Sequence, residues 1–263
     1  MLMITGASGQ LGKLITSQLK AVQTEFVEGT REVSDGHASS RRIDFEHPTS
    51  LDFSDVTTLL LISAGYGEDD QVIARHAAAI HAAERDGVKQ VIYTSLTGAG
   101  DHLTFALAHR WTEARLQRSA MKWTILRNGL YAELLGQLTQ SQEGVVTTPL
   151  GEGRLAAVAR ADLAEVAAKV ASQPDKHACK VYELVGTVAI GGRDVAQAQA
   201  AEYRPRGLTE TRTALLSTGL APFQIPMLMS IYSAIAGGFL KGTGGDLRWL
   251  LGKEPRPALQ HLR

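Results

Sequence analysis

Three glycines near the start of the chain, Gly6, Gly9 and Gly12, are spaced for binding a dinucleotide. They follow an apolar run, 2–5, that predicts a buried strand, and they precede apolar residues at helical intervals. A strand that turns through glycines into a helix directs free N–H groups and the positive end of the helix dipole at one point, where a pyrophosphate binds. We expect Gly6 to permit the tight turn, Gly9 to admit phosphate and Gly12 to allow close helix–strand packing. An ordinary turn on a nucleotide-free scaffold is the alternative.

The residues that close the second predicted strand bear on the choice of cofactor. A carboxylate there accepts hydrogen bonds from the adenosine ribose, whereas an arginine binds a 2′-phosphate in bidentate fashion. The chain offers Glu28, Arg31 and Glu32 close together. Because Glu28 lies inside the strand and Arg31 just past its end, the pattern favours NADP(H) over NAD(H), with a solvated surface arginine as the alternative.

Strand and helix patterns alternate along most of the chain, which is typical of parallel strand pairing. The sequence therefore predicts an α/β fold with a doubly wound parallel sheet, a Rossmann fold. The expected strands are 2–5, 25–29, 42–45, 56–63, 88–95, 122–126 and 180–185, and the expected helices include 70–86, 103–118 and a segment that ends near 172 with Asp162 as its N-cap.

The ligand of such a sheet lies across the carboxyl ends of the strands, where the strand order reverses. The residues directly after the predicted strands are therefore candidates for cofactor binding: Gly6, Ser8, Gly9, Gln10, Leu11, Arg31, Asp44, Phe45, Ser63, Ala64, Gly65, Thr94 and Ser95, with 127–131 beside them.

The length suits a large α/β unit with a small appended lobe. We expect residues 1–145 to form the NAD(P)-binding core and residues 146–263 a small, mostly helical lobe on the substrate side. Within the second part, 160–186 is expected to return a helix and a strand to the core.

Composition narrows the class of partner. The chain has 263 residues, of which 44% are hydrophobic, and its 27 basic and 27 acidic residues balance. No net field favours nucleic acid or an anionic membrane, so we expect a small-molecule partner. The single cysteine, Cys179, excludes an internal disulfide, and the histidines lack metal-site spacing, so no metal is predicted. We expect no signal peptide, no membrane span and a cytoplasmic location.

Several segments together resemble the NmrA-like, atypical branch of the short-chain dehydrogenase/reductase superfamily, and above all its NADPH-dependent quinone reductases and triphenylmethane reductases. The resemblance covers nearly the whole chain. The segments that carry it include I-T-G-A-S-G-Q-L-G (4–12), G-V-K-Q-V-I-Y-T-S-L (87–96), H-R-W-T-E-A-R-L (109–116), T-I-L-R-N-G-L-Y-A-E (124–133) and R-A-D-L-A (160–164).

The resemblance implies NADPH along the glycine loop, with Arg31 on its 2′-phosphate. It implies that the Ser63–Ala64 turn and Thr94–Ser95 flank the ribose and nicotinamide, and that His76 lies near the cofactor. Asn128 and Tyr131 match residues that line the substrate side.

The Tyr-x-x-x-Lys pair of typical short-chain reductases is missing, because no tyrosine is followed four positions later by lysine. His109 and Glu113 stand near its expected place. A quinone acceptor needs less acid catalysis, since the charge of a hydroquinone anion spreads over its ring. We therefore expect hydride transfer to a quinone or similar conjugated aromatic acceptor, with Asn128, Tyr131 and His109 as candidate catalytic residues.

The alternative function is a non-catalytic, NmrA-type dinucleotide sensor. Each candidate also has a structural alternative: Asn128 as a strand-end cap, Tyr131 as a packing aromatic and His109 as an ordinary helix residue. The sequence leaves the oligomeric state open, with a homodimer as the assembly to test.

Overall fold

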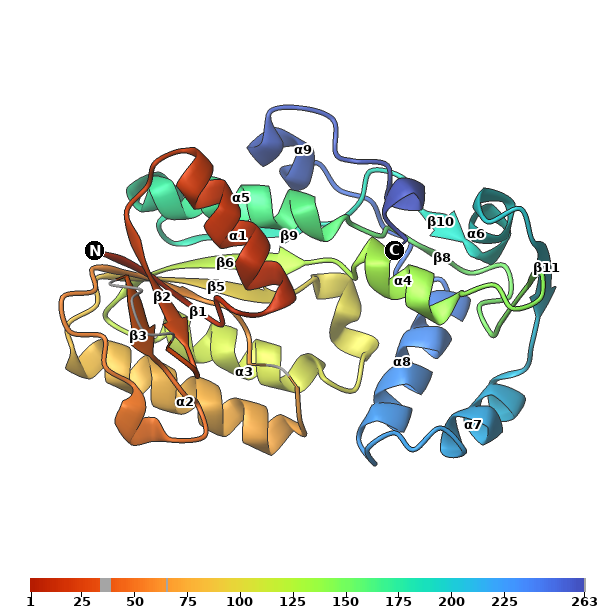
Figure 1. Cartoon of the computed structure of the whole chain (residues 1–263), viewed down its shortest axis with the longest axis horizontal. Helices are drawn as coiled ribbons and strands as arrows, with labels where there is room; N and C mark the ends of the chain where they lie inside the picture. The colour runs from red at the N-terminus through yellow and green to blue at the C-terminus, as the bar shows by residue number, and fades with distance from the viewer. Residues whose placement is uncertain (34–38, 65, 263) are drawn as a thin grey trace. The chain divides into compact units, whose positions relative to one another are not determined.

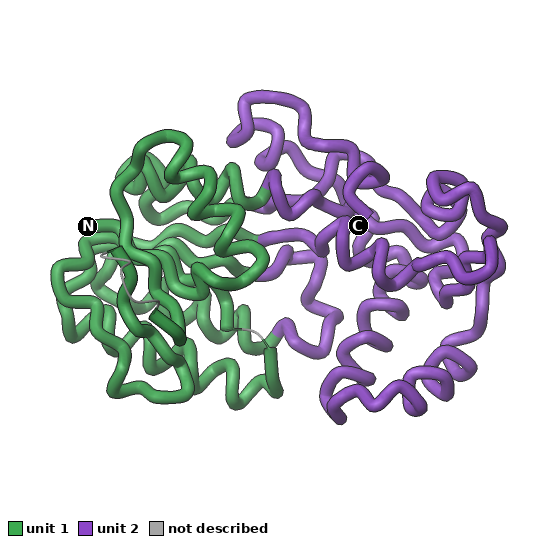
Figure 2. The backbone as a smooth tube through the Cα atoms, viewed as in Figure 1, with its two compact units in different colours: residues 1–95, 107–127, 163–182 green, residues 96–106, 128–162, 183–263 purple. Residues whose placement is uncertain are grey.

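The computed structural model describes residues 1–33, 39–64 and 66–262. It divides into two compact units, which Figure 2 shows in different colours. Unit 1 comprises residues 1–95, 107–127 and 163–182, and unit 2 comprises 96–106, 128–162 and 183–263. The chain therefore passes between the units several times, and the division into 1–145 and 146–263 stays a prediction of the sequence.

Unit 1 is built on a seven-stranded parallel sheet. Its strand order, β3-β2-β1-β4-β5-β6-β9, reverses direction between β1 and β4, so the end of β1 lies at the topological switch point. This confirms the expected Rossmann fold class. The strands are β1 (Leu2–Thr5), β2 (Phe26–Thr30), β3 (Ser40–Arg42), β4 (Thr58–Leu61), β5 (Gln90–Leu96), β6 (Lys122–Asn128) and β9 (Lys180–Leu184).

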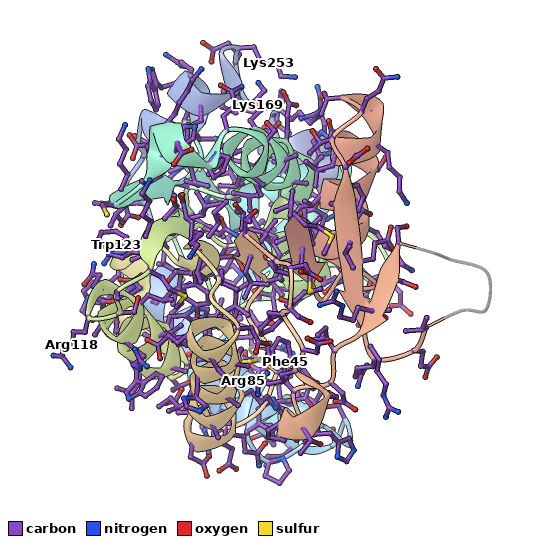
Figure 3. All side chains as sticks on the ribbon, turned by 90° about the vertical axis from the view of Figure 1, so that its left-hand side faces the viewer. Phe45, Arg85, Arg118, Trp123, Lys169 and Lys253 are labelled. Atoms are coloured by element: carbon purple, nitrogen blue, oxygen red, sulfur yellow. The ribbon has the colours of Figure 1, made fainter. Side chains whose placement is uncertain are left out.

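Helices cover both faces of this sheet, as parallel strands buried on both sides require. Helices α1 (Gln10–Ala21) and α5 (Arg160–Ser172) lie over one face, and α2 (Asp69–Arg85) and α3 (Ala106–Gln117) over the other (Figure 1). The core on the α2 side is continuous from Met3 through Tyr93 to Leu116. Phe45 and Trp123, which Figure 3 labels, are partly buried against it.

Unit 2 has its own apolar core, which joins helices to two small sheets. Strand β7 (Val145–Thr148) pairs in parallel with β11 (Glu202–Pro205), and β8 (Arg154–Leu155) pairs antiparallel with β10 (Ile190–Gly191). The sequence predicted a small, mostly helical lobe over 146–263, and these short strands were missed. The helices of the unit are α4 (Ala132–Leu138), α6 (Gly192–Ala198), α7 (Leu208–Leu216), α8 (Gln224–Ala236) and α9 (Asp246–Leu251).

Within the described residues, four short 3-10 helices complete the two units. They are η1 (Pro48–Ser50), η2 (Gly98–His102), η3 (Pro174–His177) and η4 (Ala258–His261). In the part of the chain that the structure describes, no helix combines the length and apolarity needed to cross a bilayer.

Two local predictions were wrong. The third strand was expected at 42–45 but ends at Arg42, because Asp44 instead bonds Ser50 in a turn: the Ser50 Oγ accepts from the Asp44 N–H at 2.9 Å. Asp162 was expected as an N-cap, but α5 begins at Arg160. The Asp162 carboxylate is fully buried and accepts bonds from the backbone and the guanidinium of Arg256, a partner far along the chain.

Candidate functional site

The glycine loop after β1 has the geometry that its spacing predicts. Gly6 adopts φ +63°, a conformation that L side chains rarely take. A Cβ on Gly12 would lie 2.2 Å from the Gly6 carbonyl oxygen, so only glycine permits this approach of α1 to the loop. A Cβ on Gly9 would lie 3.2 Å from the same oxygen. The loop is thus a cradle built of backbone atoms.

The side of the loop that leads into α1 is open. Ser8, Gly9 and Gln10 are exposed, whereas the Leu11 side chain is buried, which leaves only its backbone N–H for a ligand. Gly9 caps α1 without a side-chain hydrogen bond, so the N–H groups of the first helical turn have no intrahelical partners. These N–H groups and the helix dipole fit the diphosphate of a dinucleotide.

A cavity of about 510 Å³ lies beside the loop within unit 1. Its wall combines hydroxyl, amine and carboxylate groups, which suit a ribose better than an apolar ligand. The lining residues are Ala7, Ser8, Lys13, Thr16, Ser17, Lys20, Glu28, Thr30, Glu32 and Ser40.

The charges on this wall are not equivalent. Lys20 pairs with Glu28 at 2.8 Å, which compensates the carboxylate that lies within β2. Lys13 is exposed and forms no ion pair with another described residue. Arg31 follows β2 and is exposed, but it is not among the lining residues. The sequence singled out Arg31 and missed Lys13, whose place in the first turns of α1 was the available signal.

The turn after β4 is held by hydrogen bonds to buried side chains. The Ser63 N–H donates to the Thr94 hydroxyl at 2.9 Å, and the Ala64 N–H donates to Nε2 of His76 at 3.0 Å. His76 has no exposed surface, and burial lowers its pKa to about 3. His76 therefore lies behind the turn, while Ser63 and Ala64 remain partly exposed. Gly65, also proposed from the sequence, lies outside the described residues.

Asp44 and Phe45 are engaged within the fold. Asp44 Oδ1 accepts the Glu46 N–H at 3.1 Å, and Phe45 packs against the core. Both are partly exposed, so their predicted contact with the cofactor stays a prediction.

At the end of β5 the Ser95 hydroxyl is committed to a buried carboxylate. It donates to Oε1 of Glu113 at 2.6 Å, and Glu113 is 4% exposed. The guanidinium of Arg127 donates to both oxygens of the same carboxylate, and Arg110 adds a bond of 2.8 Å. Two cations thus compensate one buried charge, which fixes the carboxyl ends of β5 and β6 relative to α3.

His109 occupies the helix position one turn before Glu113 and is also engaged. Its Nδ1 lies 2.8 Å from the hydroxyl of Tyr93, a side chain with no exposed surface. Burial and the nearby charge of Arg110 lower the pKa of His109 to about 4, so the ring is neutral at physiological pH. A neutral imidazole bonded to a buried phenol is a poor source of protons.

Asn128 and Tyr131 belong to unit 2 and lie together there. Asn128 ends β6, and its side chain is one of the groups that lower the pKa of Tyr131, against the larger rise that burial causes. Tyr131 is the N-cap residue of α4 and is partly exposed, and the guanidinium of Arg160 lies over its ring. The sequence did not identify Arg160, because it is distant in the chain and only backbone pairing brings it to Tyr131.

An open parallel sheet with a glycine cradle at its switch point defines a dinucleotide-binding Rossmann protein. The model of a family described as NAD(P)H-binding matches residues 6–174, and the chain belongs to this family. The expected binding of a nicotinamide dinucleotide is confirmed at this level.

Comparison with relatives shows similarity beyond residues 6–174. Quinone oxidoreductase 2 of Escherichia coli is 37% identical over 202 residues, which cover 72% of this chain and 70% of the relative. An NmrA-like family oxidoreductase of Aspergillus flavus is 26% identical over 99% of this chain and 93% of its own. The NADP(H) complex of Citrobacter sp. triphenylmethane reductase has a TM-score of 0.89 and 28% identity, covering 99% and 98% of the two chains. The resemblance to NmrA-like reductases is confirmed.

Proposed function

We propose that this protein is an NADPH-dependent reductase that transfers a hydride to a quinone or a similar conjugated aromatic acceptor. The observation that carries the proposal is the backbone cradle at Gly6, Gly9 and Gly12, which is placed at the switch point and open toward a polar cavity. The reductases named above, with their quinone and triphenylmethane acceptors, support the class of reaction.

NADPH is preferred over NADH in this proposal because of the charges around the cavity. Lys13 is unpaired among the described residues and is available for a 2′-phosphate, and Arg31 follows the strand that lines the same cavity. The carboxylate of Glu28, which would repel a phosphate, is already paired with Lys20. Glu32 opposes the preference, since it also lines the cavity and is exposed.

The residues at the helix position where typical reductases carry their tyrosine and lysine agree with a quinone-type acceptor. His109 and Glu113 stand there, and both are engaged in buried hydrogen bonds. The reduced nicotinamide supplies the hydride when it is bound. The residues Asn128 and Tyr131 would then contact the acceptor, with positioning of the reacting atoms contributing much of the rate.

The first test is turnover. Oxidation of NADPH, followed by loss of the nicotinamide absorbance in the presence of a panel of quinones, is expected to be faster than without an acceptor. Binding of NADPH with no turnover on any acceptor would instead indicate a dinucleotide sensor.

The second test is cofactor preference by calorimetry. Lys13→Ala and Arg31→Ala are each expected to weaken NADPH binding by about tenfold and to leave NADH binding nearly unchanged, since a charge-assisted bond to phosphate contributes about 1.5–3 kcal/mol. Lys176→Ala, an exposed lysine outside the cavity, is the control. An equal loss for both cofactors would contradict the preference for NADPH.

A further inference from the structure

Tyr131 and Arg160 are held side by side in unit 2 by the backbone. Tyr131 forms a parallel β-bridge with Val158, and the Ala132 N–H donates to the Val158 carbonyl oxygen at 2.8 Å. Two residues further on, Arg160 begins α5, and its guanidinium carbon lies 4.8 Å from the centroid of the Tyr131 ring. A cation at this distance over a phenol face is attracted by the electrons of the ring.

The charge of Arg160 is directed at the tyrosine. No carboxylate within residues 1–33, 39–64 and 66–262 forms an ion pair with this guanidinium. The Glu133 carboxylate accepts the backbone N–H of Arg160 at 3.1 and 3.2 Å instead, at the N-terminus of α5. The positive charge therefore remains available to a negative charge that develops beside it.

The phenol oxygen has a second stabilising neighbour. Burial raises the pKa of Tyr131, while the charge of Arg160 and the hydrogen bond with Asn128 act in the opposite direction, and the Glu133 carboxylate adds to the rise. Arg160 and Asn128 thus both favour the ionised form of the phenol. This is the role that a lysine has beside the catalytic tyrosine of typical short-chain reductases.

We propose that Tyr131 donates the proton that completes reduction of the acceptor, and that Arg160 is the positioning residue that stabilises the phenolate left behind. The inference rests on the proposed function. In place of the missing tyrosine–lysine pair, this protein would use Tyr131 at the start of α4 and Arg160 at the start of α5.

The proton and electron balance is closed by the acceptor and by water. Hydride transfer delivers two electrons to the quinone, which becomes a hydroquinone anion while the coenzyme is oxidised. The O–H bond of Tyr131 then breaks and a new O–H bond forms on the hydroquinone oxygen. The phenolate of Tyr131, held by the Asn128 side chain and the Arg160 guanidinium, takes a proton from water, so each turnover consumes one solvent proton.

The first experiment measures ionisation of Tyr131 without cofactor or acceptor. Phenolate absorbance is titrated in the wild type and in Tyr131→Phe, and the difference isolates Tyr131. In Arg160→Gln this ionisation is expected to move to higher pH, and Arg160→Lys is expected to restore part of the shift. Arg204→Gln, which removes an exposed arginine of unit 2, is the control and is expected to leave it unmoved.

The second experiment measures turnover. Tyr131→Phe and Arg160→Gln are each expected to lower kcat with a quinone by about 100-fold, in the range of general acid catalysis, with KM for NADPH unchanged. Because the two residues act as one unit, the double variant is expected to be no slower than Tyr131→Phe. Arg160→Lys serves if Arg160→Gln does not fold.

The outcomes separate the inference from the function on which it rests. An unmoved Tyr131 titration in Arg160→Gln, or full turnover in Tyr131→Phe, overturns the inference and leaves the reductase function standing. A wild-type protein that binds NADPH but reduces no quinone overturns the proposed function, whatever the titration shows.

Discussion

The backbone N–H of Ala64 donates to Nε2 of His76 across 3.0 Å, and this bond joins a buried helix residue to the turn after β4. Because Nε2 accepts, the ring proton lies on Nδ1, which is 2.8 Å from the Thr112 hydroxyl. Thr112 in turn donates its own proton to the Ala108 carbonyl oxygen at 2.7 Å. His76 is therefore fixed as one neutral tautomer, and its ring holds the turn in place.

The first prediction concerns this support. His76→Phe leaves the Ala64 N–H without its acceptor, so we expect a loss of about 1–3 kcal/mol in the free energy of unfolding. We also expect weaker dinucleotide binding, because the Ser63–Ala64 turn loses its anchor. His76→Gln, whose amide oxygen reaches about as far as Nε2, is expected to retain part of both.

Urea unfolding and calorimetry with NADPH check this prediction. His81→Phe, an exposed residue of the same helix, is the matched control and is expected to change neither quantity. Equal stability and affinity of His76→Phe and the wild type would show that the bond contributes nothing.

The second prediction concerns pH. Burial lowers the pKa of His76 to about 3 and that of His109 to about 4, both from an ordinary value of 6.5. Between the lowered value and 6.5 the unfolded chain binds more protons than the folded one, so the stability that these residues contribute is complete above pH 6.5 and declines as the pH falls. Each histidine is expected to add up to about 1.4 kcal/mol of lost stability per pH unit in its window.

The measurement is the urea midpoint from above pH 6.5 down to about pH 5. The slope is expected to be smaller in His76→Gln and in His109→Gln, and smallest in the double variant. Comparison with the wild type separates the histidines from carboxylates that titrate at lower pH. A double variant with the wild-type slope would refute the assignment.

The third prediction distinguishes the glycines of the loop. At Gly12 a Cβ meets backbone atoms at 2.2 Å, so Gly12→Ala is expected to destabilise the fold and to abolish cofactor binding together. At Gly9 a Cβ meets only the Gly6 carbonyl oxygen, at 3.2 Å, so Gly9→Ala is expected to fold and to bind NADPH at least tenfold more weakly.

Thermal unfolding and calorimetry distinguish the two glycine variants. Gly242→Ala is the control, since nothing lies within 4 Å of a Cβ at that position. Unchanged affinity in Gly9→Ala would mean that phosphate does not approach this glycine.

The fold could be predicted from the sequence because its signals are local. Short apolar runs predict the strands β4 and β5, and the glycine loop predicts the turn before α1. Each of these patterns lies within a few residues. Parallel pairing and the switch point then follow from alternation and handedness. The third strand was misplaced because its short polar segment, Ser40–Arg42, carries no apolar pattern.

The candidate site was predictable only in part, because its remaining features depend on partners that are distant in the chain. Asp162 is a residue type typical of an N-cap and precedes a helical pattern, yet its carboxylate binds Arg256. Likewise Arg160 reaches Tyr131 only through the bridge at Val158. No local pattern encodes either pair, since each is created by packing of separate segments.

The fourth prediction separates structure from function at the end of β5. Glu113→Gln removes a buried negative charge and leaves Arg110 and Arg127 facing a neutral amide, so we expect a loss of about 3 kcal/mol in stability. Glu84→Gln, in the more exposed pair with Arg115, is the control and is expected to lose less than about 1 kcal/mol.

A substitution at Ser95 tests whether the same hydrogen-bond network also contributes to cofactor binding. Its hydroxyl proton is engaged by Glu113 at 2.6 Å, so Ser95→Ala is expected to cost about 1 kcal/mol of stability. If the hydroxyl serves only the carboxylate, NADPH affinity stays unchanged in Ser95→Ala. A tenfold loss of affinity together with this loss of stability would instead place the Ser95 oxygen on the cofactor, as an acceptor of its ribose hydroxyls, and would show that one side chain serves both partners.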